Sequence, residues 1–321
     1  MAPVSGRYTK KPERAGVGGQ IYDGSPGITT TEGGMSTRRS PTPLAGRTAV
    51  ITGAGSGIGR SLAQRLGAHG CPLAIVDAND EALAATAAML DGPTLAQTLD
   101  VRDREGQLAF AAEVREWSPA PIGAVFNNAG VAMGSPLAET SLEDDERVFA
   151  INFDGVVNGV RAFLPILLEQ RDGAIVNTSS IFGLVGARDQ TAYCASKFAV
   201  RGFTDSLRQE LKGTGVRAIV VHPGGTKTNI IRSAHMHVDV RDGRTQEEHA
   251  AAFEARARTT PERAAEIIHT GVDRGRARIL VGPDAHFVDA LARITPTHTV
   301  SVLEGLERLA ARRARKAAGA G

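Results

Sequence analysis

The sequence predicts an α/β domain in which one doubly wound parallel sheet of about seven strands carries helices on both faces. Short apolar segments alternate with longer amphipathic ones from residue 48 onward. The apolar segments are continuous, which is typical of strands covered on both sides. Regular alternation of strands and helices indicates parallel strands joined by right-handed crossovers. A chain of 321 residues is long enough for one such domain.

Each element follows from its local pattern. The predicted strands are TAVIT (48–52), LAIVD (73–77), TLAQTL (94–99), IGAVFN (122–127), AIVNTS (174–179), VRAIVV (216–221) and RILV (278–281). The predicted helices lie near residues 57–69, 80–91, 103–117, 142–170, 191–213 and 261–274. No internal repeat or interior linker separates these elements, so we expect a single domain.

Composition divides the chain into three regions. Residues 1–45 are rich in Gly, Pro, Ser and Thr without a hydrophobic period, and predict a disordered N-terminal extension. Residues 46–298 hold the sheet domain, in which 229–260 is the expected substrate loop. Residues 299–321 predict a basic amphipathic C-terminal helix. Such a helix can dock on its own domain or on a partner subunit, or make a weak peripheral contact with an anionic membrane.

Composition also excludes several function classes. Lys plus Arg (37) nearly balances Asp plus Glu (35), which argues against a nucleic-acid partner. Cys71 and Cys194 lie far apart and in no metal-ligand spacing, so we expect neither a disulfide nor a metal site. The longest apolar runs are about strand length, short of the ~20 residues of a membrane span. These features predict a cytoplasmic protein with a small-molecule partner.

A glycine-rich turn joins the first strand to the first helix. It reads Gly53-Ala54-Gly55-Ser56-Gly57-Ile58-Gly59. Glycines let the backbone turn tightly and approach a pyrophosphate, whose charge sits at the helix N-terminus. Because this turn occupies the first strand–helix junction of a βαβ unit, it predicts a dinucleotide site rather than an empty turn.

Asp77 ends the second strand and predicts which dinucleotide is bound. A carboxylate at this position accepts hydrogen bonds from the adenine ribose hydroxyls and repels a 2′-phosphate. No Arg or Lys follows it, since the next residues are Ala78 and Asn79, and Ser56 is the polar residue of the glycine turn. These residues favour NAD over NADP.

Tyr193 and Lys197 predict a catalytic pair. Their spacing of four residues places a phenol and an ammonium group on one face of a helix. A nearby cation lowers the pKa of a tyrosine and makes it a usable base near neutral pH. Ser180 lies thirteen residues before Tyr193, just past the end of an apolar strand, where ligand-facing loops of such sheets lie.

With these motifs, the sequence resembles the short-chain dehydrogenase/reductase family of NAD(P)-binding Rossmann-fold oxidoreductases, from about Leu44 to about Pro283. Seven motifs occur in the family's order and at similar spacings. They are the glycine turn 52–59, Asp100-Val101, Asn127-Asn128-Ala129-Gly130, Asn152, Asn177-Thr178-Ser179-Ser180, Tyr193 with Lys197, and Pro223-Gly224.

The resemblance implies a role for each matched residue. Tyr193 gives or takes the hydroxyl proton, and Lys197 holds the nicotinamide ribose and lowers the pKa of Tyr193. Ser180, rather than Ser179, hydrogen-bonds the substrate oxygen. Asn152 holds a water that relays protons from solvent.

The residues implied to contact the cofactor follow the glycine turn, the strand ends and the segment under the nicotinamide. They are Gly53, Ser56, Gly57, Ile58, Gly59, Asp77, Asp100, Val101, Asn128, Ala129, Gly130, Tyr193, Lys197, Pro223, Gly224, Thr226 and Thr228. Within this set Thr228 bonds the nicotinamide carboxamide. Thr226 departs from the family, where an aliphatic residue is more usual.

The expected activity is NAD-dependent hydride transfer between an alcohol and a ketone or aldehyde, without a metal. Apolar residues in 229–260 favour a moderately apolar or lipid-like substrate. Two alternatives stay open: a non-catalytic dinucleotide-binding sensor, and an NADP-dependent ketone reductase on the same fold.

Apolar residues in two long helices predict a homo-oligomer, either a dimer or a tetramer. They are Val156, Val157, Val160, Phe163, Leu164, Phe198, Phe203 and Leu207, in the stretches 142–170 and 191–213. Members of the family that this sequence resembles pair these helices across a two-fold axis.

Overall fold

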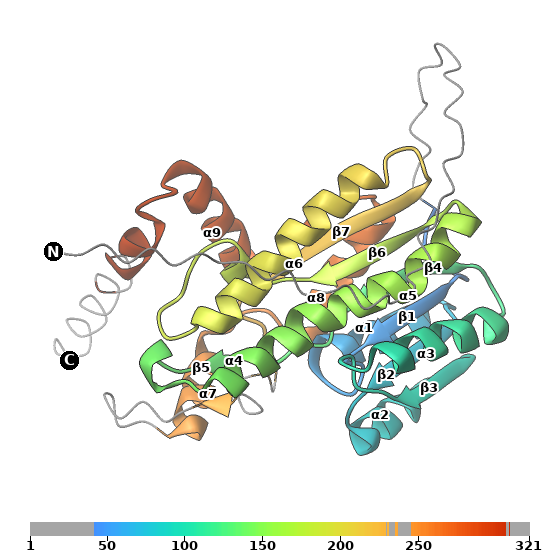
Figure 1. Cartoon of the computed structure of the whole chain (residues 1–321), viewed down its shortest axis with the longest axis horizontal. Helices are drawn as coiled ribbons and strands as arrows, with labels where there is room; N and C mark the ends of the chain where they lie inside the picture. The colour runs from blue at the N-terminus through green and yellow to red at the C-terminus, as the bar shows by residue number, and fades with distance from the viewer. Residues whose placement is uncertain (1–41, 229, 231–234, 237–244, 306–307, 309–321) are drawn as a thin grey trace, which may run out of the picture. The chain divides into compact units, whose positions relative to one another are not determined.

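The computed structural model describes residues 42–228, 230, 235–236, 245–305 and 308, all in one compact unit of the chain (Figure 1). The strands are β1 (Thr48–Thr52), β2 (Leu73–Asp77), β3 (Thr94–Thr98), β4 (Ile122–Asn127), β5 (Met133–Gly134), β6 (Gly173–Thr178), β7 (Val216–Pro223), β8 (His235–Met236) and β9 (Arg278–Val281). The helices are α1 (Gly57–Ala68), α2 (Asp80–Ala87), α3 (Arg104–Trp117), α4 (Leu142–Phe149), α5 (Gly155–Gln170), α6 (Thr191–Glu210), α7 (Gln246–Arg256), α8 (Pro261–Asp273) and α9 (Pro283–Ile294).

Seven of the strands form one parallel sheet in the order β3-β2-β1-β4-β6-β7-β9, while β5 pairs only with β8. The chain winds outward from β1 in one direction and then from β4 in the other. This is the doubly wound topology that the sequence predicts, and that prediction is confirmed.

Helices cover both faces of the sheet. Residues alternate along β1, so that Ile51 packs with Leu62 of α1 and Ile268 of α8, while Val50 packs with Phe163 of α5 on the opposite face. Figure 1 shows α5 and α6 side by side on the second face. The two apolar layers explain why the central strands are continuous apolar runs.

Several elements differ from the sequence-based prediction. The stretch 142–170 is helical throughout, as predicted, but a π-helical turn (Ala150–Asp154) interrupts the α-helical pattern between α4 and α5. The strand β3 is an edge strand whose residues are only partly buried. Two helices, α7 and α9, were not predicted. The proline that opens α9 and the aspartate in its first turn are helix-start signals that could have revealed it.

The packed chain begins earlier than residue 46, which corrects the predicted boundary. Leu44 is fully buried in the core. Its main-chain N–H donates to Asp273 at 2.9 Å, and its carbonyl accepts from the thiol of Cys71 at 3.1 Å. A single leucine within a Pro- and Ser-rich stretch carries no periodic signal. Residues 1–41, the greater part of the expected extension, lie outside the described residues.

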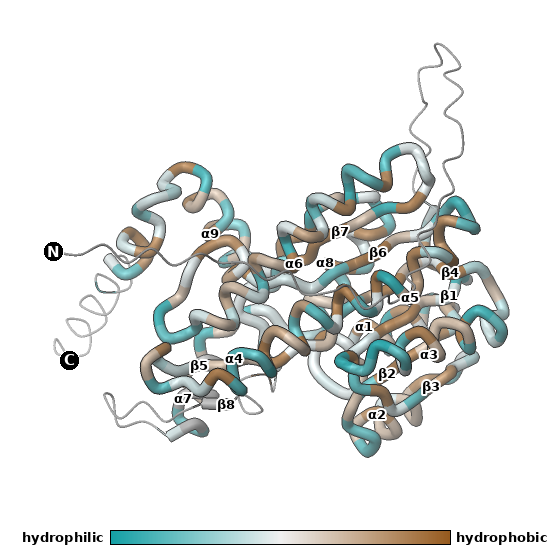
Figure 2. The backbone as a smooth tube through the Cα atoms, viewed as in Figure 1, coloured by the Kyte–Doolittle hydropathy of each residue, from teal (hydrophilic) through white to brown (hydrophobic). Residues whose placement is uncertain are grey.

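The run Leu142–Gln170 is long and apolar enough to cross a membrane by length and composition alone. Figure 2 shows brown, apolar segments along α5. Val156, Val160 and Leu167 are buried against the sheet, as in the core helix of a globular domain. Their burial accounts for the apolar composition without a membrane.

The predicted C-terminal helix is described at residues 299–305 and 308, and is helical there. Leu303 packs against a cluster formed by Leu184, Val185 and Val288, whereas Val300 is 41% exposed. Leu303 thus docks on its own domain, one of the outcomes that the sequence left open. Leu306 and Leu309 lie outside the described residues.

Candidate active site

The predicted site residues gather at the carboxyl ends of the strands, around the place where the strand order reverses between β1 and β4. Ligands of open parallel sheets bind in the crevice at this place. Segments that are far apart in the sequence therefore contribute to one site.

The glycine turn between β1 and α1 is tied to the end of β4. The Thr52 hydroxyl accepts hydrogen bonds from the main-chain N–H groups of Asn128 and Ala129, at 3.0 and 3.1 Å. The Asn128 side chain donates to the Thr52 carbonyl at 3.2 Å. A Cβ at Gly59 would overlap the carbonyl oxygen of Gly53, so only glycine allows α1 to begin this close to β1.

The start of α1 can receive an anion. Helix α1 begins at Gly57, between Ser56 and Ile58. Within the described chain, no side chain caps the first N–H groups of this helix. Free N–H groups and the positive end of the helix dipole favour a phosphate here. Thr228 faces the same turn, since its methyl carbon would lie 3.1 Å from a Cβ at Gly57.

Asp77 turns toward the glycine turn rather than into solvent. Its carboxylate accepts hydrogen bonds from the N–H of Gly55 at 2.8 Å and from the N–H of Asn79 at 2.9 Å. The carboxylate is therefore fixed beside the turn, where the ribose of a bound dinucleotide would lie.

Arg60 is a residue of this region that the sequence motifs do not include. Its Nε donates to the Thr86 hydroxyl at 2.9 Å, and its Nη2 donates to the carbonyl groups of Gly55 and Ala82. A cation thus lies next to the glycine turn, although no Arg or Lys directly follows Asp77 in the sequence. Its Nε and Nη2 donors are directed at the Thr86 hydroxyl and at main-chain oxygens, which gives the arginine a structural role.

The residues expected at the adenine end lie after β3. Val101 is buried, and its carbonyl accepts from Gln107 at 2.8 Å. Asp100 forms an ion pair with Arg102 at 2.6 Å. The hydrogen bonds from Arg102 hold the pKa of Asp100 below its usual value. Asp100 is thus a carboxylate already oriented by its neighbour.

Asn152 lies in the π-helical turn and is fully buried. Its amide oxygen accepts from the N–H of Val131 at 2.8 Å, and its amide nitrogen donates to the Val131 carbonyl at 3.0 Å and to the Ser196 hydroxyl at 3.2 Å. These bonds lock the segment after β4 onto α6. Single π turns often occur at functional sites.

Ser180, Tyr193 and Lys197 come together at the end of β6 and the start of α6. The Ser180 hydroxyl is close enough to the Tyr193 phenol to lower its pKa, and the Lys197 ammonium lies 5.8 Å from the centre of the Tyr193 ring. Lys197 donates to the Thr178 carbonyl at 3.1 Å. A Cβ at Gly130 would lie 3.2 Å from the ammonium nitrogen, so this glycine keeps space beside it.

The ionisation of this pair differs from the sequence-based expectation. Burial raises the pKa of Tyr193 to about 12, and the hydrogen bond from Ser180 offsets only part of that rise. Burial lowers the pKa of Lys197 to about 8. Burial is therefore the largest influence on the pKa of Tyr193, and it acts against the lowering that the sequence analysis assigns to Lys197.

The two adjacent serines, Ser179 and Ser180, make different contacts in the structure. The Ser179 hydroxyl donates to the Lys197 carbonyl at 2.8 Å and is buried there. Ser180 is the residue whose hydroxyl reaches Tyr193. Its hydroxyl also accepts from the N–H of Phe182 at 3.1 Å, which holds it at the start of a short 3₁₀ turn (Ile181–Gly183).

The segment expected under the nicotinamide continues from β7. Pro223 ends that strand, and the N–H of Gly224 donates to the Val281 carbonyl of β9 at 2.9 Å. Thr226 is buried and pairs with Thr259, a residue that the sequence did not single out. This segment is therefore braced by the chain that follows it.

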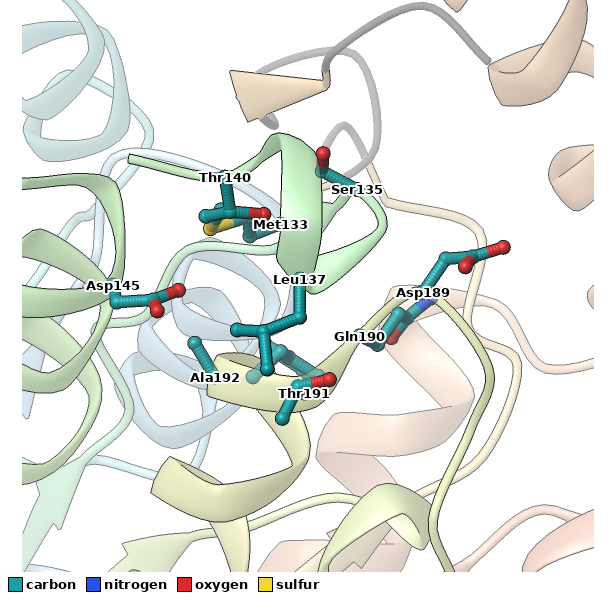
Figure 3. A pocket seen from close by; sticks show the side chains of 10 residues that line it. Met133, Ser135, Leu137, Thr140, Asp145, Asp189, Gln190, Thr191 and Ala192 are labelled. Atoms are coloured by element: carbon teal, nitrogen blue, oxygen red, sulfur yellow. The ribbon is translucent and has the colours of Figure 1, made fainter. Parts of the chain in front are cut away.

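Apolar residues border the Tyr193 phenol. Phe182 meets it edge to face at 6.3 Å between ring centres, and Ala132 and Ile230 pack in the same cluster. A small pocket lies between α4, the chain after β5 and the start of α6, and Tyr193 is one of its lining residues (Figure 3). There Leu137 points toward the beginning of α6, and Asp145 contributes a carboxylate from α4.

Together these residues fit a nicotinamide dinucleotide. The glycine turn leaves space that a Cβ would fill, the start of α1 offers unblocked N–H groups, and Asp77 faces the turn. At the other end, Gly130 keeps open the space beside Lys197.

Comparisons with known proteins agree with this geometry. A family model described as short chain dehydrogenase matches residues 47–238. The Mycobacterium tuberculosis protein SadH is 45% identical over 78% of this chain and 91% of its own length. A 3beta-hydroxysteroid dehydrogenase 2 of Eggerthella lenta is 38% identical over 61% of this chain and 77% of its own length. A crystal structure of a short chain dehydrogenase/reductase from Burkholderia phymatum in complex with NAD superposes with a TM-score of 0.70 at 31% identity, covering 78% of this chain and 94% of that one.

Proposed function

Because this chain belongs to the short-chain dehydrogenase family, we propose that it is an NAD-dependent oxidoreductase that interconverts an alcohol and a ketone or aldehyde. One observation carries the proposal. The Ser180 hydroxyl, the Tyr193 phenol and the Lys197 ammonium come together beside the crevice at the carboxyl ends of β1 and β4. A sensor has no need of this combination.

When bound, the nicotinamide ring supplies or accepts the hydride. The work of the protein is then to hold the substrate oxygen and manage its proton. Ser180 and Tyr193 would hydrogen-bond the same substrate oxygen and stabilise its developing charge. With its raised pKa, Tyr193 is a phenol at neutral pH and can donate a proton to a ketone oxygen as that ketone is reduced.

Alcohol oxidation requires the reverse transfer. Tyr193 must first lose its proton, and Lys197 provides the positive charge that makes this loss possible. Asn152 has its amide groups engaged by Val131 and Ser196. Both amide N–H groups of Asn152 are used, so its side chain would hold a proton-relaying water through the second lone pair of its oxygen.

Three observations support NAD over NADP. Asp77 presents a carboxylate next to Gly55, where a 2′-phosphate would meet a like charge. Arg60, the nearby cation, is engaged by main-chain oxygens. The structural relative from Burkholderia phymatum is in complex with NAD.

The substrate class follows from the border of the site. Phe182, Ala132 and Ile230 present apolar surface around the Tyr193 phenol, which favours a moderately apolar or lipid-like alcohol or ketone. The relatives include a 3beta-hydroxysteroid dehydrogenase, a levodione reductase and a 2-dehydro-3-deoxy-L-rhamnonate dehydrogenase, so the family members similar to this chain differ in the substrates that their names give. We place the enzyme in the cytoplasm, and expect it to work as a homo-oligomer.

The assay that tests the proposal follows absorbance at the reduced-nicotinamide band. Purified protein is incubated with NAD and a panel of cyclic secondary alcohols, and with NADH and the matching ketones. Turnover of any pair supports the proposal. Tight binding of NADH without turnover across the panel would instead favour the dinucleotide-binding sensor.

A further inference from the structure

Asp284, on α9, belongs to none of the motifs of the site, yet it contacts the segment expected beneath the nicotinamide. Its Oδ2 accepts a hydrogen bond from the main-chain N–H of Gly225 at 2.6 Å. The adjacent N–H, that of Gly224, is held by the Val281 carbonyl at 2.9 Å. Two consecutive N–H groups after β7 are thus fixed by residues that lie about sixty positions later in the chain.

The carboxylate fits into a cradle of backbone. A Cβ at Gly224 would overlap Oδ1 of Asp284, and a Cβ at Gly282 would lie 2.6 Å from the same atom. Gly282 has a φ of +98°, which side chains rarely adopt, and it is the residue just before α9. Glycine at both positions allows this close approach.

The chain after α7 braces the same segment. Thr259 pairs with Thr226, and its carbonyl accepts from the N–H of Lys227 at 2.9 Å. Asp284 is therefore the side chain that completes a set of main-chain contacts to residues 224–227. Its Oδ1 is buried and, among the described residues, has no hydrogen-bond partner. Burial of a carboxylate oxygen without a partner is unfavourable, so the unpaired Oδ1 does not itself stabilise the fold.

We propose that Asp284 is a positioning residue for the cofactor site: it sets the backbone of residues 223–228, and through them the place where the nicotinamide half of the dinucleotide rests. The inference rests on the proposed function. It makes α9 part of the apparatus that holds the cofactor, although α9 lies outside the matched family segment 47–238.

The test compares Asp284→Ala with Asp284→Asn, which keeps an amide oxygen able to accept from Gly225. The matched control is Asp289→Ala, on the same helix, whose partly buried carboxylate pairs with Arg278 and Arg293, away from residues 223–228 in the contacts it makes. Two quantities are measured: the Kd of NADH by fluorescence titration, and amide hydrogen exchange of residues 224–228 in cofactor-free protein.

Loss of a hydrogen bond to a charged group predicts that Asp284→Ala raises the Kd of NADH and speeds exchange at the Gly225 amide, each by about tenfold or more. Asp284→Asn should restore most of the NADH affinity and most of the protection of the Gly225 amide, and Asp289→Ala should change neither quantity. Wild-type affinity and exchange in Asp284→Ala, or equal losses in the Ala and Asn variants, would overturn the inference. If the wild-type protein binds no reduced nicotinamide dinucleotide, the proposed function fails, while the exchange rates still decide whether Asp284 holds the segment.

Discussion

The main-chain carbonyl of Ser180 lies 2.9 Å from Nδ1 of His222, a histidine on β7 with no solvent exposure. Because a carbonyl can only accept, Nδ1 carries the proton and donates it. Burial lowers the pKa of His222 to about 4, so the ring is neutral at physiological pH. A neutral imidazole thus anchors the backbone of the residue whose hydroxyl faces Tyr193.

This arrangement predicts acid sensitivity. The pKa of His222 is lower in the folded protein, about 4, than its ordinary 6.5. The unfolded chain therefore binds more protons between these values, and stability is lost as the pH falls through this window. From pH 7 to pH 5 we expect His222 to cost on the order of 2 kcal/mol of unfolding free energy.

The variant His222→Asn keeps an N–H donor for Ser180 and removes the titration. Urea unfolding at pH 7 and pH 5 should show a smaller loss of stability in this variant than in the wild type. His286→Asn, which alters an exposed histidine of α9, should retain the wild-type pH dependence. Equal pH dependence in the wild type and His222→Asn would contradict the assignment.

Cofactor preference depends on Asp77. Charged hydrogen bonds contribute roughly 1.5–3 kcal/mol each, so one or two to the ribose should give NAD an advantage on the order of a hundredfold in kcat/KM. Asp77→Ala should erode that advantage, and Asp77→Ala with Ala78→Arg should shift preference toward NADP. The ratio of kcat/KM for the two cofactors measures both effects. Asp80→Ala, at the start of α2, is the control. A wild type that uses NADP as well as NAD would refute this prediction.

Leu44 links the N-terminal side of the chain to the core. It is fully buried, so Leu44→Ala should lower the unfolding free energy by about 2–5 kcal/mol. Deletion of residues 1–40 should leave the unfolding free energy unchanged, because these residues show no hydrophobic period with which to pack on the core. Urea unfolding of both proteins tests the boundary. A deletion as harmful as Leu44→Ala would show that the segment contributes to folding.

Oligomer formation should depend on the outer faces of α5 and α6. Of the apolar residues predicted to pair subunits, Val156, Val160, Phe163 and Leu207 are buried in the chain's own core, which corrects that part of the prediction. Phe198 of α6 is 40% exposed, and Val157, Leu164 and Phe203 are partly exposed. These four leave an apolar surface available to a second copy.

Light scattering measures the oligomeric state directly. The wild type should be a dimer or tetramer at micromolar concentration, and Phe198→Ser should dissociate it without loss of the fold. Phe287→Ser, an exposed aromatic on α9, should leave the assembly intact. A monomeric wild type would rule out the expected assembly.

The strands and most helices could be predicted because their signals are local. β1, β2, β4 and β9 begin and end where the apolar runs do, and the spacing of Tyr193 from Lys197 is visible in one helix. The π turn at Asn152 depends on contacts with Val131 and Ser196, which come from other elements.

The burial of individual side chains is harder to predict from the sequence than the positions of strands and helices. The pKa of Tyr193 depends on how completely the surrounding chain removes it from water, which a sequence spacing does not reveal. Arg60, His222 and Asp284 act through partners 5 to 59 residues away, on other elements or on backbone atoms. An isolated polar residue in a helix or strand gives no sign of such a partner.

The central claim is that the Tyr193 phenol transfers the substrate proton. The most direct measurement is the turnover of Tyr193→Phe, together with the Kd of NADH for the same protein. Removal of the proton donor should reduce turnover by about 10²–10⁴-fold, while the Kd of NADH stays close to that of the wild type. Lys197→Ala should reduce both turnover and NADH affinity. A Tyr193→Phe protein that keeps more than about a tenth of wild-type turnover would contradict the claim.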